Sequence, residues 1–92
     1  MATGDKYEGE WMAGKKNGRG LYIFANGDIY EGEFEEGNRQ GEGSYTWTDQ
    51  SYYRGQWMAD KMNGKGLYAN AEIELEGYFE NDNFVRPLTQ SN

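Results

Sequence analysis

The chain has 92 residues, of which 36% are hydrophobic and 16% aromatic, and its formal net charge is -7. This length allows one small domain whose burial must rest largely on Tyr, Trp and Phe rings, and the negative charge argues against nucleic-acid binding, because phosphate contacts need clustered Lys and Arg. The sequence contains neither Cys nor His, which excludes a disulfide framework, a thiolate metal site and the commonest general base, so we expect no metal and no cofactor.

The lead-in, residues 1–6, carries no apolar segment of the kind found in a secretory signal. No later apolar run approaches the roughly 20 residues that a membrane-spanning helix needs. We therefore expect a soluble, cytoplasmic protein.

The next segment, YEGEWMAGKKNGRGLYIF at residues 7–24, predicts a β-hairpin. Polar and apolar residues alternate in YEGEW and in GRGLYIF, as they do in half-exposed strands, and turn residues fill AGKKNG between them. A four-residue turn would place Trp11 opposite Gly20 and Tyr7 opposite Phe24.

The same pattern returns twice, with a period of 23 residues that brings Tyr, Gly and Trp or Phe into register. A period of this length is typical of stacked repeat arrays. A partial fourth copy, LEGYF, begins one residue early, and the final segment has no repeat pattern, so we interpret it as an end cap or a partner-docking strip. The predicted organisation is a lead-in at 1–6, an array at 7–80 with repeats 7–29, 30–52, 53–74 and a partial repeat at 75–80, and a C-terminal tail at 81–92.

The loop between successive hairpins is predicted from parity. Because the period is odd, a loop of three or five residues around Asn26 and Gly27 is needed to keep all rings on one face. It would place Tyr22 opposite Gly32, with each sheet glycine between aromatic rings. The early start of the fourth copy predicts a loop one residue shorter near Ala71.

These columns resemble the MORN repeat (membrane occupation and recognition nexus). The motif is Tyr-x-Gly-x-Trp/Phe, then Gly-x-x-x-Gly-x-Gly, a Tyr in the second strand and a Gly-containing loop, and the resemblance extends from residue 7 to about residue 80. It implies an all-β fold, a single-layer, elongated, twisted antiparallel meander of hairpins. It also implies function by contact, since MORN arrays occur in ciliary radial-spoke proteins, cytoskeletal scaffolds and lipid kinases, where a separate domain supplies any catalysis.

Alternation places most of the rings on one face of the predicted sheet. Without a second sheet to cover them, these rings would exceed the apolar patch usual for a monomer. Stacking of rings on glycines would hide part of the row, and the remainder would form a groove for an amphipathic helix or an extended peptide. We expect the partner-binding residues to be Tyr7, Trp11, Tyr22, Phe24, Tyr30, Phe34, Tyr45, Trp47, Tyr53, Trp57 and Tyr68.

Basic residues near successive hairpin turns predict a row along one edge of the sheet. Such a row could contact anionic lipid headgroups or an acidic partner. We favour solvated turn charge over this interpretation, because Glu36 and Asp60 dilute the row, so membrane contact is not the preferred function. The residues of the row are Lys15, Lys16, Arg39 and Lys61.

Paired glutamates raise the question of acid–base catalysis. Glu8 and Glu10 recur in the second copy, whereas the third copy has Arg54 and Gln56 in their place. We therefore interpret the glutamates as solvated charges on the face opposite the rings, and we predict no catalytic residue.

The sequence thus predicts a non-enzymatic structural adaptor or scaffold subunit that binds a helix or peptide of a larger assembly. The family resemblance favours a ciliary, flagellar or other cytoskeletal assembly. The alternatives are a peripheral module that binds anionic phospholipids and a regulatory subunit of a kinase or methyltransferase. The open edges of the sheet, which Glu8, Glu10, Glu76 and Glu80 guard in part, leave two options open: end-to-end self-association and addition of a strand by a partner.

Overall fold

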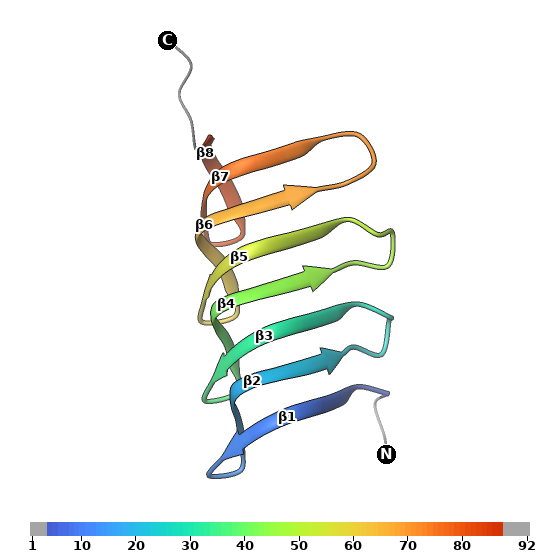
Figure 1. The fold of residues 1–92 in the computed structure, drawn as a ribbon, viewed down its shortest axis with the longest axis vertical. Helices are drawn as coiled ribbons and strands as arrows, with labels where there is room; N and C mark the ends of the chain where they lie inside the picture. Colours follow the sequence, from blue (N-terminus) through green and yellow to red (C-terminus); the bar gives the residue numbers. More distant parts are fainter. Residues whose placement is uncertain (1–3, 88–92) are drawn as a thin grey trace.

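The computed structural model describes residues 4–87, which form one open antiparallel sheet of eight strands that pair in chain order (Figure 1). The strands are β1 (Lys6–Met12), β2 (Lys15–Ile23), β3 (Ile29–Glu35), β4 (Asn38–Thr46), β5 (Tyr52–Met58), β6 (Lys61–Ala69), β7 (Glu74–Glu80) and β8 (Asn83–Pro87). The all-β, single-layer meander predicted from the sequence is confirmed. Residues 4–87 contain no helix, and hence none suited to crossing a membrane.

Each hairpin turns over two residues, not the four that the sequence predicts. In all four turns both residues have positive φ, as at Ala13 (52°) and Gly14 (79°). This conformation matches the right-handed twist of paired strands, which is why two-residue hairpins prefer it. Lys15 and Lys16 therefore belong to β2 rather than to the turn.

The predicted strand register is wrong by two residues. Gly9 lies opposite Gly20, and Gly20 lies opposite Gly32 across the next junction, whereas the predicted pairs were Trp11 with Gly20 and Tyr22 with Gly32. A shift of two keeps every side chain on its expected face. The consequence is that glycines face glycines across the strands instead of facing rings.

An irregularity within each of the first three hairpins accounts for part of this shift. One residue separates Gly9 from Trp11 on β1, but three separate their partners Gly20 and Lys16 on β2. The same mismatch occurs between β3 and β4 and between β5 and β6. Such bulges bend the strands locally, and Figure 1 shows the turn ends of the hairpins curving away from the plane of the sheet.

The curved turn ends are hydrogen bonded to the repeat before them. The Gly37 N–H donates to the Lys16 carbonyl at 2.9 Å, and equivalent bonds fix the next two turns. An amide side chain adds a second bond in each case, since Asn17 accepts from the Glu36 N–H at 3.2 Å. Gln40 and Asn63 make the same bond to the following turns. Each turn is thereby stacked on its predecessor.

The loops between hairpins have the lengths predicted from the odd repeat period. Five residues join β2 to β3 and β4 to β5, and four join β6 to β7. In the first of these loops the Phe24 N–H donates to the Asp28 carbonyl at 2.8 Å. The shorter third loop contains Ala71, where the sequence predicts the deletion.

A buried aspartate, which sequence reasoning missed, joins two of these loops. The Asp28 carboxylate accepts hydrogen bonds from the Tyr45 hydroxyl at 2.8 Å and from the Thr48 N–H at 3.1 Å. Asp5, which lies 23 residues earlier, makes the same two kinds of bond to Tyr22 and Ala25. The spacing of 23 is the signal by which this column could have been found.

The last strand, β8, completes a fourth hairpin with β7 and comes from the segment interpreted as a cap or docking strip. Phe84 lies opposite Phe79, and the strand ends at Pro87. The rest of the tail, like residues 1–3, lies outside the described residues. The molecule measures 52 × 26 × 17 Å, so it is elongated as expected.

Candidate functional site

The ring face is the side of the sheet that carries the predicted binding rings together with Phe79 and Phe84. In each of the first three hairpins a tyrosine covers a second-strand glycine: Tyr7 covers Gly20, Tyr30 covers Gly43 and Tyr53 covers Gly66. A Cβ atom on Gly43 would lie only 2.5 Å from Cε1 of Tyr30. Glycine is needed at these positions because the ring occupies the space of a side chain.

The hydroxyl groups of these tyrosines are bonded inside the hairpin irregularities. The Tyr30 hydroxyl donates to the Glu33 carbonyl at 2.8 Å, and the Tyr53 hydroxyl donates to the Gln56 carbonyl at 2.8 Å. Burial is the main cause that raises the pKa of Tyr30 well above its usual value and the pKa of Tyr53 to about 12. Both groups are therefore protonated at neutral pH and serve as structural donors.

Glu10 and Glu33 are not simply solvated charges, which corrects the interpretation from alternation. Each accepts a hydrogen bond from a backbone N–H of the bulged second strand, and Gln56 does so in the third hairpin. The bonds run from Arg19 to Glu10 at 3.1 Å, from Glu42 to Glu33 at 3.1 Å and from Lys65 to Gln56 at 2.8 Å. An amide oxygen satisfies the same donor, so this role does not require a carboxylate.

Rings from neighbouring repeats interlock edge to face. The Trp57 ring packs on Tyr53 of its own repeat and on Tyr30 of the repeat before it, with centroid separations of 5.3 Å in both cases. Phe34 contacts Tyr30 and Tyr7 in the same manner. Edge-to-face pairs of this kind add stability beyond the area that they bury.

Much of the predicted binding row is consequently core, so more of it is covered than the part that ring-on-glycine stacking was expected to hide. Bulges and interlocking rings bury Tyr30, Phe34, Tyr45, Tyr53 and Trp57. Partly buried are Tyr7, Tyr22, Phe24, Trp47 and Tyr68, while Trp11 is 59% exposed. Only these last six rings have surface available to a partner.

The predicted basic row is divided between two places. Lys15 and Lys61 are exposed at the starts of β2 and β6. Lys16 and Arg39, one residue further from their turns, lie over the ring face, with the Lys16 Nζ 5.1 Å from the centre of the Tyr22 ring. A single row along one edge is therefore wrong, because consecutive strand residues point to opposite faces.

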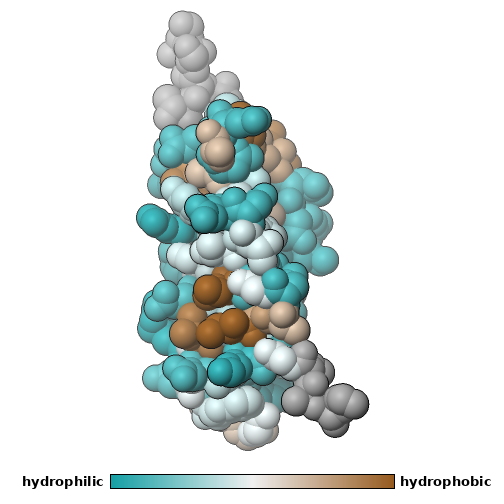
Figure 2. All heavy atoms as spheres, turned by 90° about the vertical axis from the view of Figure 1, so that its right-hand side faces the viewer, coloured by the Kyte–Doolittle hydropathy of each residue, from teal (hydrophilic) through white to brown (hydrophobic). Residues whose placement is uncertain are grey.

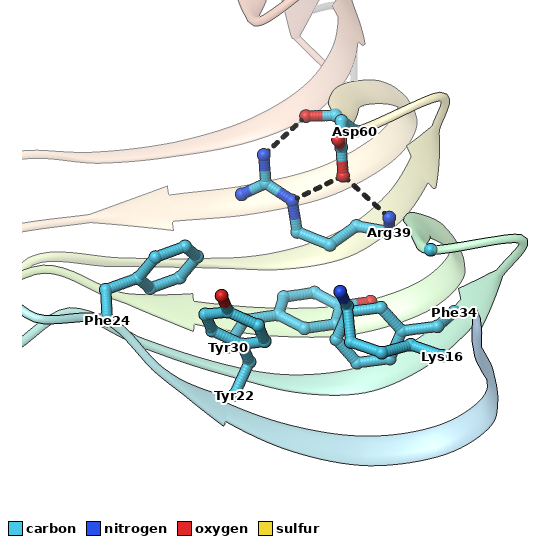
Figure 3. A pocket seen from close by; sticks show the side chains of 8 residues that line it. Lys16, Tyr22, Phe24, Tyr30, Phe34, Arg39 and Asp60 are labelled. Atoms are coloured by element: carbon cyan, nitrogen blue, oxygen red, sulfur yellow. Dashed lines mark hydrogen bonds and ion pairs between the residues drawn. The ribbon is translucent and has the colours of Figure 1, made fainter. Parts of the chain in front are cut away.

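Arg39 forms an ion pair with an acidic partner, whereas Lys16 forms none with another residue of the range 4–87. The Arg39 Nε lies 3.1 Å from Oδ1 of Asp60, and its Nη2 donates to the Asp60 carbonyl at 2.8 Å. The guanidinium carbon also lies 4.7 Å from the centre of the Trp57 ring. Within residues 4–87 Lys16 makes no ion pair, and its ammonium group faces the pocket shown in Figure 3.

This pocket is the candidate functional site. Its volume is about 170 Å³, and aromatic rings form its floor beneath the two cations (Figure 3). Small-molecule sites usually enclose roughly 300–1,000 Å³, so this hollow is of a size for one side chain rather than for a cofactor. It is lined by Lys16, Tyr22, Phe24, Tyr30, Phe34, Gly37, Arg39 and Asp60.

Other surfaces of the described chain are less suited to apolar contact. Figure 2 looks at the end of the sheet that carries the inter-hairpin loops, and it shows mainly hydrophilic or neutral atoms, with the most strongly hydrophobic atoms gathered in a patch in the lower half of the view. A hollow on the opposite face of the sheet is lined largely by charged groups, including Arg19, Glu31 and Arg54. Among residues 4–87 no three acidic side chains converge in a way that could hold a metal ion.

Comparison with known families agrees with the repeat pattern. The family model described as MORN repeat matches three consecutive segments of the chain, at residues 7–29, 30–52 and 53–70. The first two segments coincide with the first two repeats of the sequence analysis, and the third begins at the same residue. A search of curated proteins found no match.

Proposed function

The chain belongs to the MORN-repeat family, and from that premise we propose that it is a non-enzymatic adaptor that binds an extended peptide or helix of a larger assembly on its ring face. MORN repeats are in general modules for interaction with proteins or membranes. The family resemblance supports a ciliary, flagellar or other cytoskeletal assembly as the setting of this adaptor.

The pocket beside Lys16 is the observation that carries the proposal. An ammonium group without an ion-pair partner among residues 4–87 lies next to the partly buried rings of Tyr22 and Phe24. A bound segment would place an acidic side chain against Lys16 and an apolar side chain on the rings. Charge-assisted hydrogen bonds are about twice as strong as neutral ones, so the ammonium group would favour acidic segments.

The same geometry gives less support to lipid binding. Lys15 and Lys61 are exposed but belong to hairpins two repeats apart, and Arg39 is already paired with Asp60. Stable electrostatic attraction to a membrane needs several clustered basic residues, each contributing about 1 kcal/mol. A protein segment is therefore the better occupant of this face.

A site-specific crosslinker tests which face is engaged. p-Benzoylphenylalanine in place of Phe24 lies in the pocket, and the same group in place of Glu31 lies on the opposite face. We expect the Phe24 position to crosslink to one discrete protein segment with acidic and apolar residues, identified by mass spectrometry, and the Glu31 position to give no such product. Crosslinking from Glu31 alone would contradict the proposal.

Binding of the captured segment then tests the role of Lys16. Met62 occupies the equivalent position two repeats later, so Lys16→Met removes the charge while keeping a side chain that this position accepts. We expect roughly tenfold weaker binding, equal to about 1.4 kcal/mol. Lys61→Met, outside the pocket, is the control. If the Lys61 variant is the weaker binder and the wild-type chain floats with anionic liposomes, the lipid alternative is favoured instead.

A further inference from the structure

In the described part of the chain, β1 at the N-terminal edge of the sheet has no preceding strand beside it, whereas every later repeat has one. Phe34, Trp57 and Phe79 stand in the column of Trp11 and are 5%, 4% and 5% exposed, whereas Trp11 is 59% exposed. Each of the three later rings packs on a tyrosine of the preceding repeat. Among residues 4–87 the Trp11 ring packs only on Tyr7 of its own repeat, at 4.9 Å, because β1 is the first strand of the described sheet.

Trp57 shows which contacts a preceding strand provides to a ring in this column. Its indole Nε1–H donates to the Gly43 carbonyl on the preceding strand at 3.1 Å, and Arg39 from that strand covers the ring. Within residues 4–87 the Trp11 indole makes neither contact. A strand added beside β1 would supply both a backbone carbonyl and a side chain over the ring.

The charges along β1 indicate which side chains a strand added beside it would carry. Across the β2–β3 junction, Arg19 lies opposite Glu33, with Nη1 and Oε2 3.7 Å apart. Glu10 is the counterpart of Glu33 one repeat earlier, and Glu8 lies beside it on the same face. A strand that pairs with β1 in the register of the array would therefore meet Glu10 with the residue that corresponds to Arg19.

A second copy of the chain is a poor occupant for this edge. Two β1 strands that pair antiparallel about Gly9 would place Glu8 of each copy opposite Glu10 of the other, and like charges directly opposite are destabilising. At the other edge, the described part of β8 comprises five residues, and the last of them is Pro87, which has no N–H to donate. Short edges and proline both discourage further pairing.

We propose that β1 is a docking edge for one extended segment of a partner with the pattern Gly-basic-Gly-x-aromatic. In the register of the β2–β3 junction, the second glycine faces Gly9, the basic residue faces Glu10 and the aromatic residue faces Tyr7. The first glycine faces Trp11 and leaves space for its ring. This edge is separate from the pocket beside Lys16, so the docking proposal and the proposed function can each fail without the other.

The chain itself supplies a probe with this pattern. Residues 15–24, KKNGRGLYIF, can be synthesised with blocked ends and added to the full-length protein labelled with ¹⁵N. We expect a saturable shift of the Trp11 indole N–H signal, with little change in the signals of Trp47 and Trp57. Absence of any shift at millimolar peptide, or a shift confined to Trp47, would overturn the proposal.

Two altered peptides and one protein variant separate the contributions of the basic residue, the backbone hydrogen bonds and the Trp11 ring to peptide binding. We expect at least tenfold weaker binding when Arg19 of the peptide is changed to Glu, and a similar loss when Gly20 is changed to Pro, which removes a backbone donor. Trp11→Ala in the protein, at a largely exposed position, should weaken binding by a comparable factor. If the Arg19→Glu peptide binds as tightly as the unaltered peptide, the proposed contact between a basic residue and Glu10 is contradicted.

Sedimentation of the protein alone tests whether a second copy occupies the edge. A dimer that depends on Trp11 would show that it does and would overturn the proposal.

Discussion

Gly43 has no space for a side chain, because the Tyr30 ring lies over its Cα atom. Tyr30 is fully buried and hydrogen bonded to Glu33, so the ring cannot easily move aside. We expect Gly43→Ala to lower the free energy of unfolding by roughly 3 kcal/mol, the upper end of ordinary overpacking costs. Urea denaturation of the two proteins measures this difference.

Gly37 offers a matched control for that substitution. A Cβ atom there would meet nothing within 4 Å, and the equivalent turn position in the next repeat is Asp60, with φ of 73°. Gly37→Asp should therefore change stability much less than Gly43→Ala, although it gives up the freedom of glycine at positive φ. If both variants are equally destabilised, the ring contact is not the reason why glycine is needed in the sheet.

The buried tyrosines predict a loss of stability at high pH. The pKa of Tyr53 is about 12 in the folded chain, and burial also raises the pKa of Tyr30, whereas an unfolded tyrosine titrates near 10. The folded state therefore disfavours the phenolate. This contribution to stability is fully present below about pH 10 and is lost as the pH rises from 10 toward 12.

Melting temperatures between pH 8 and pH 12 test this expectation. Other ionisable groups also contribute to the pH dependence of stability, so the informative quantity is the difference between the wild-type protein and Tyr53→Phe. The variant lacks the hydrogen bond to Gln56 and should be less stable at pH 8, but its melting temperature should fall less steeply above pH 10. Parallel pH profiles for the two proteins would exclude Tyr53 as a source of the effect.

At the level of the hairpin, the position of a repeat in the array decides how much the aromatic ring in the Trp11 column contributes to the stability of the fold. Trp57 packs between two repeats and is almost fully buried, whereas Trp11 belongs to the first strand and is largely exposed. Trp57→Ala should reduce the free energy of unfolding by roughly 3–5 kcal/mol. Trp11→Ala removes one edge-to-face contact and should cost about 1 kcal/mol. Equal losses in chemical denaturation would mean that the edge strand is covered in solution.

The strands, the loop lengths and the stacking of repeats could be predicted from the sequence because they follow from periodicity and parity. The register could not, because Gly14 and Gly18 are equally plausible turn glycines in AGKKNG. The observed turn places Ala13 at positive φ, which is unusual for alanine. The shift of two residues leaves the pattern of faces unchanged, so nothing in the alternation distinguishes the two registers.

The candidate site was harder to predict for the same reason. Whether Lys16 belongs to the turn or to β2, where alternation places it on the ring face, depends on the turn length. The burial of Tyr30 depends on the bulge that bends each hairpin. Neither feature has a strong sequence signature, although Lys16, Arg39 and Met62 recur with the period of the repeat. The strand β8 lacks the glycine and tyrosine columns, and the contact of Phe84 with Phe79 at 5.3 Å is what joins its ring to the core.

At the level of the whole molecule, the sheet is a linear array in which each strand pairs only with its neighbours in the sequence. The stability of such arrays is approximately a sum of repeat terms and nearest-neighbour terms, so damage at one end should remain local. Phe84 is a suitable place to test this, because its ring packs on Phe79 at the C-terminal end.

Phe84→Ala should therefore increase amide hydrogen exchange in β7 and β8 while leaving β3 and β4 protected as in the wild-type chain. Val85, which is 52% exposed on the same strand, provides the control, and Val85→Ala should change exchange little. A uniform loss of protection along all strands would instead show that the chain unfolds as one cooperative unit. If unfolding is local in this way, the first hairpin stays folded when the last hairpin opens. The β1 edge then remains available for docking.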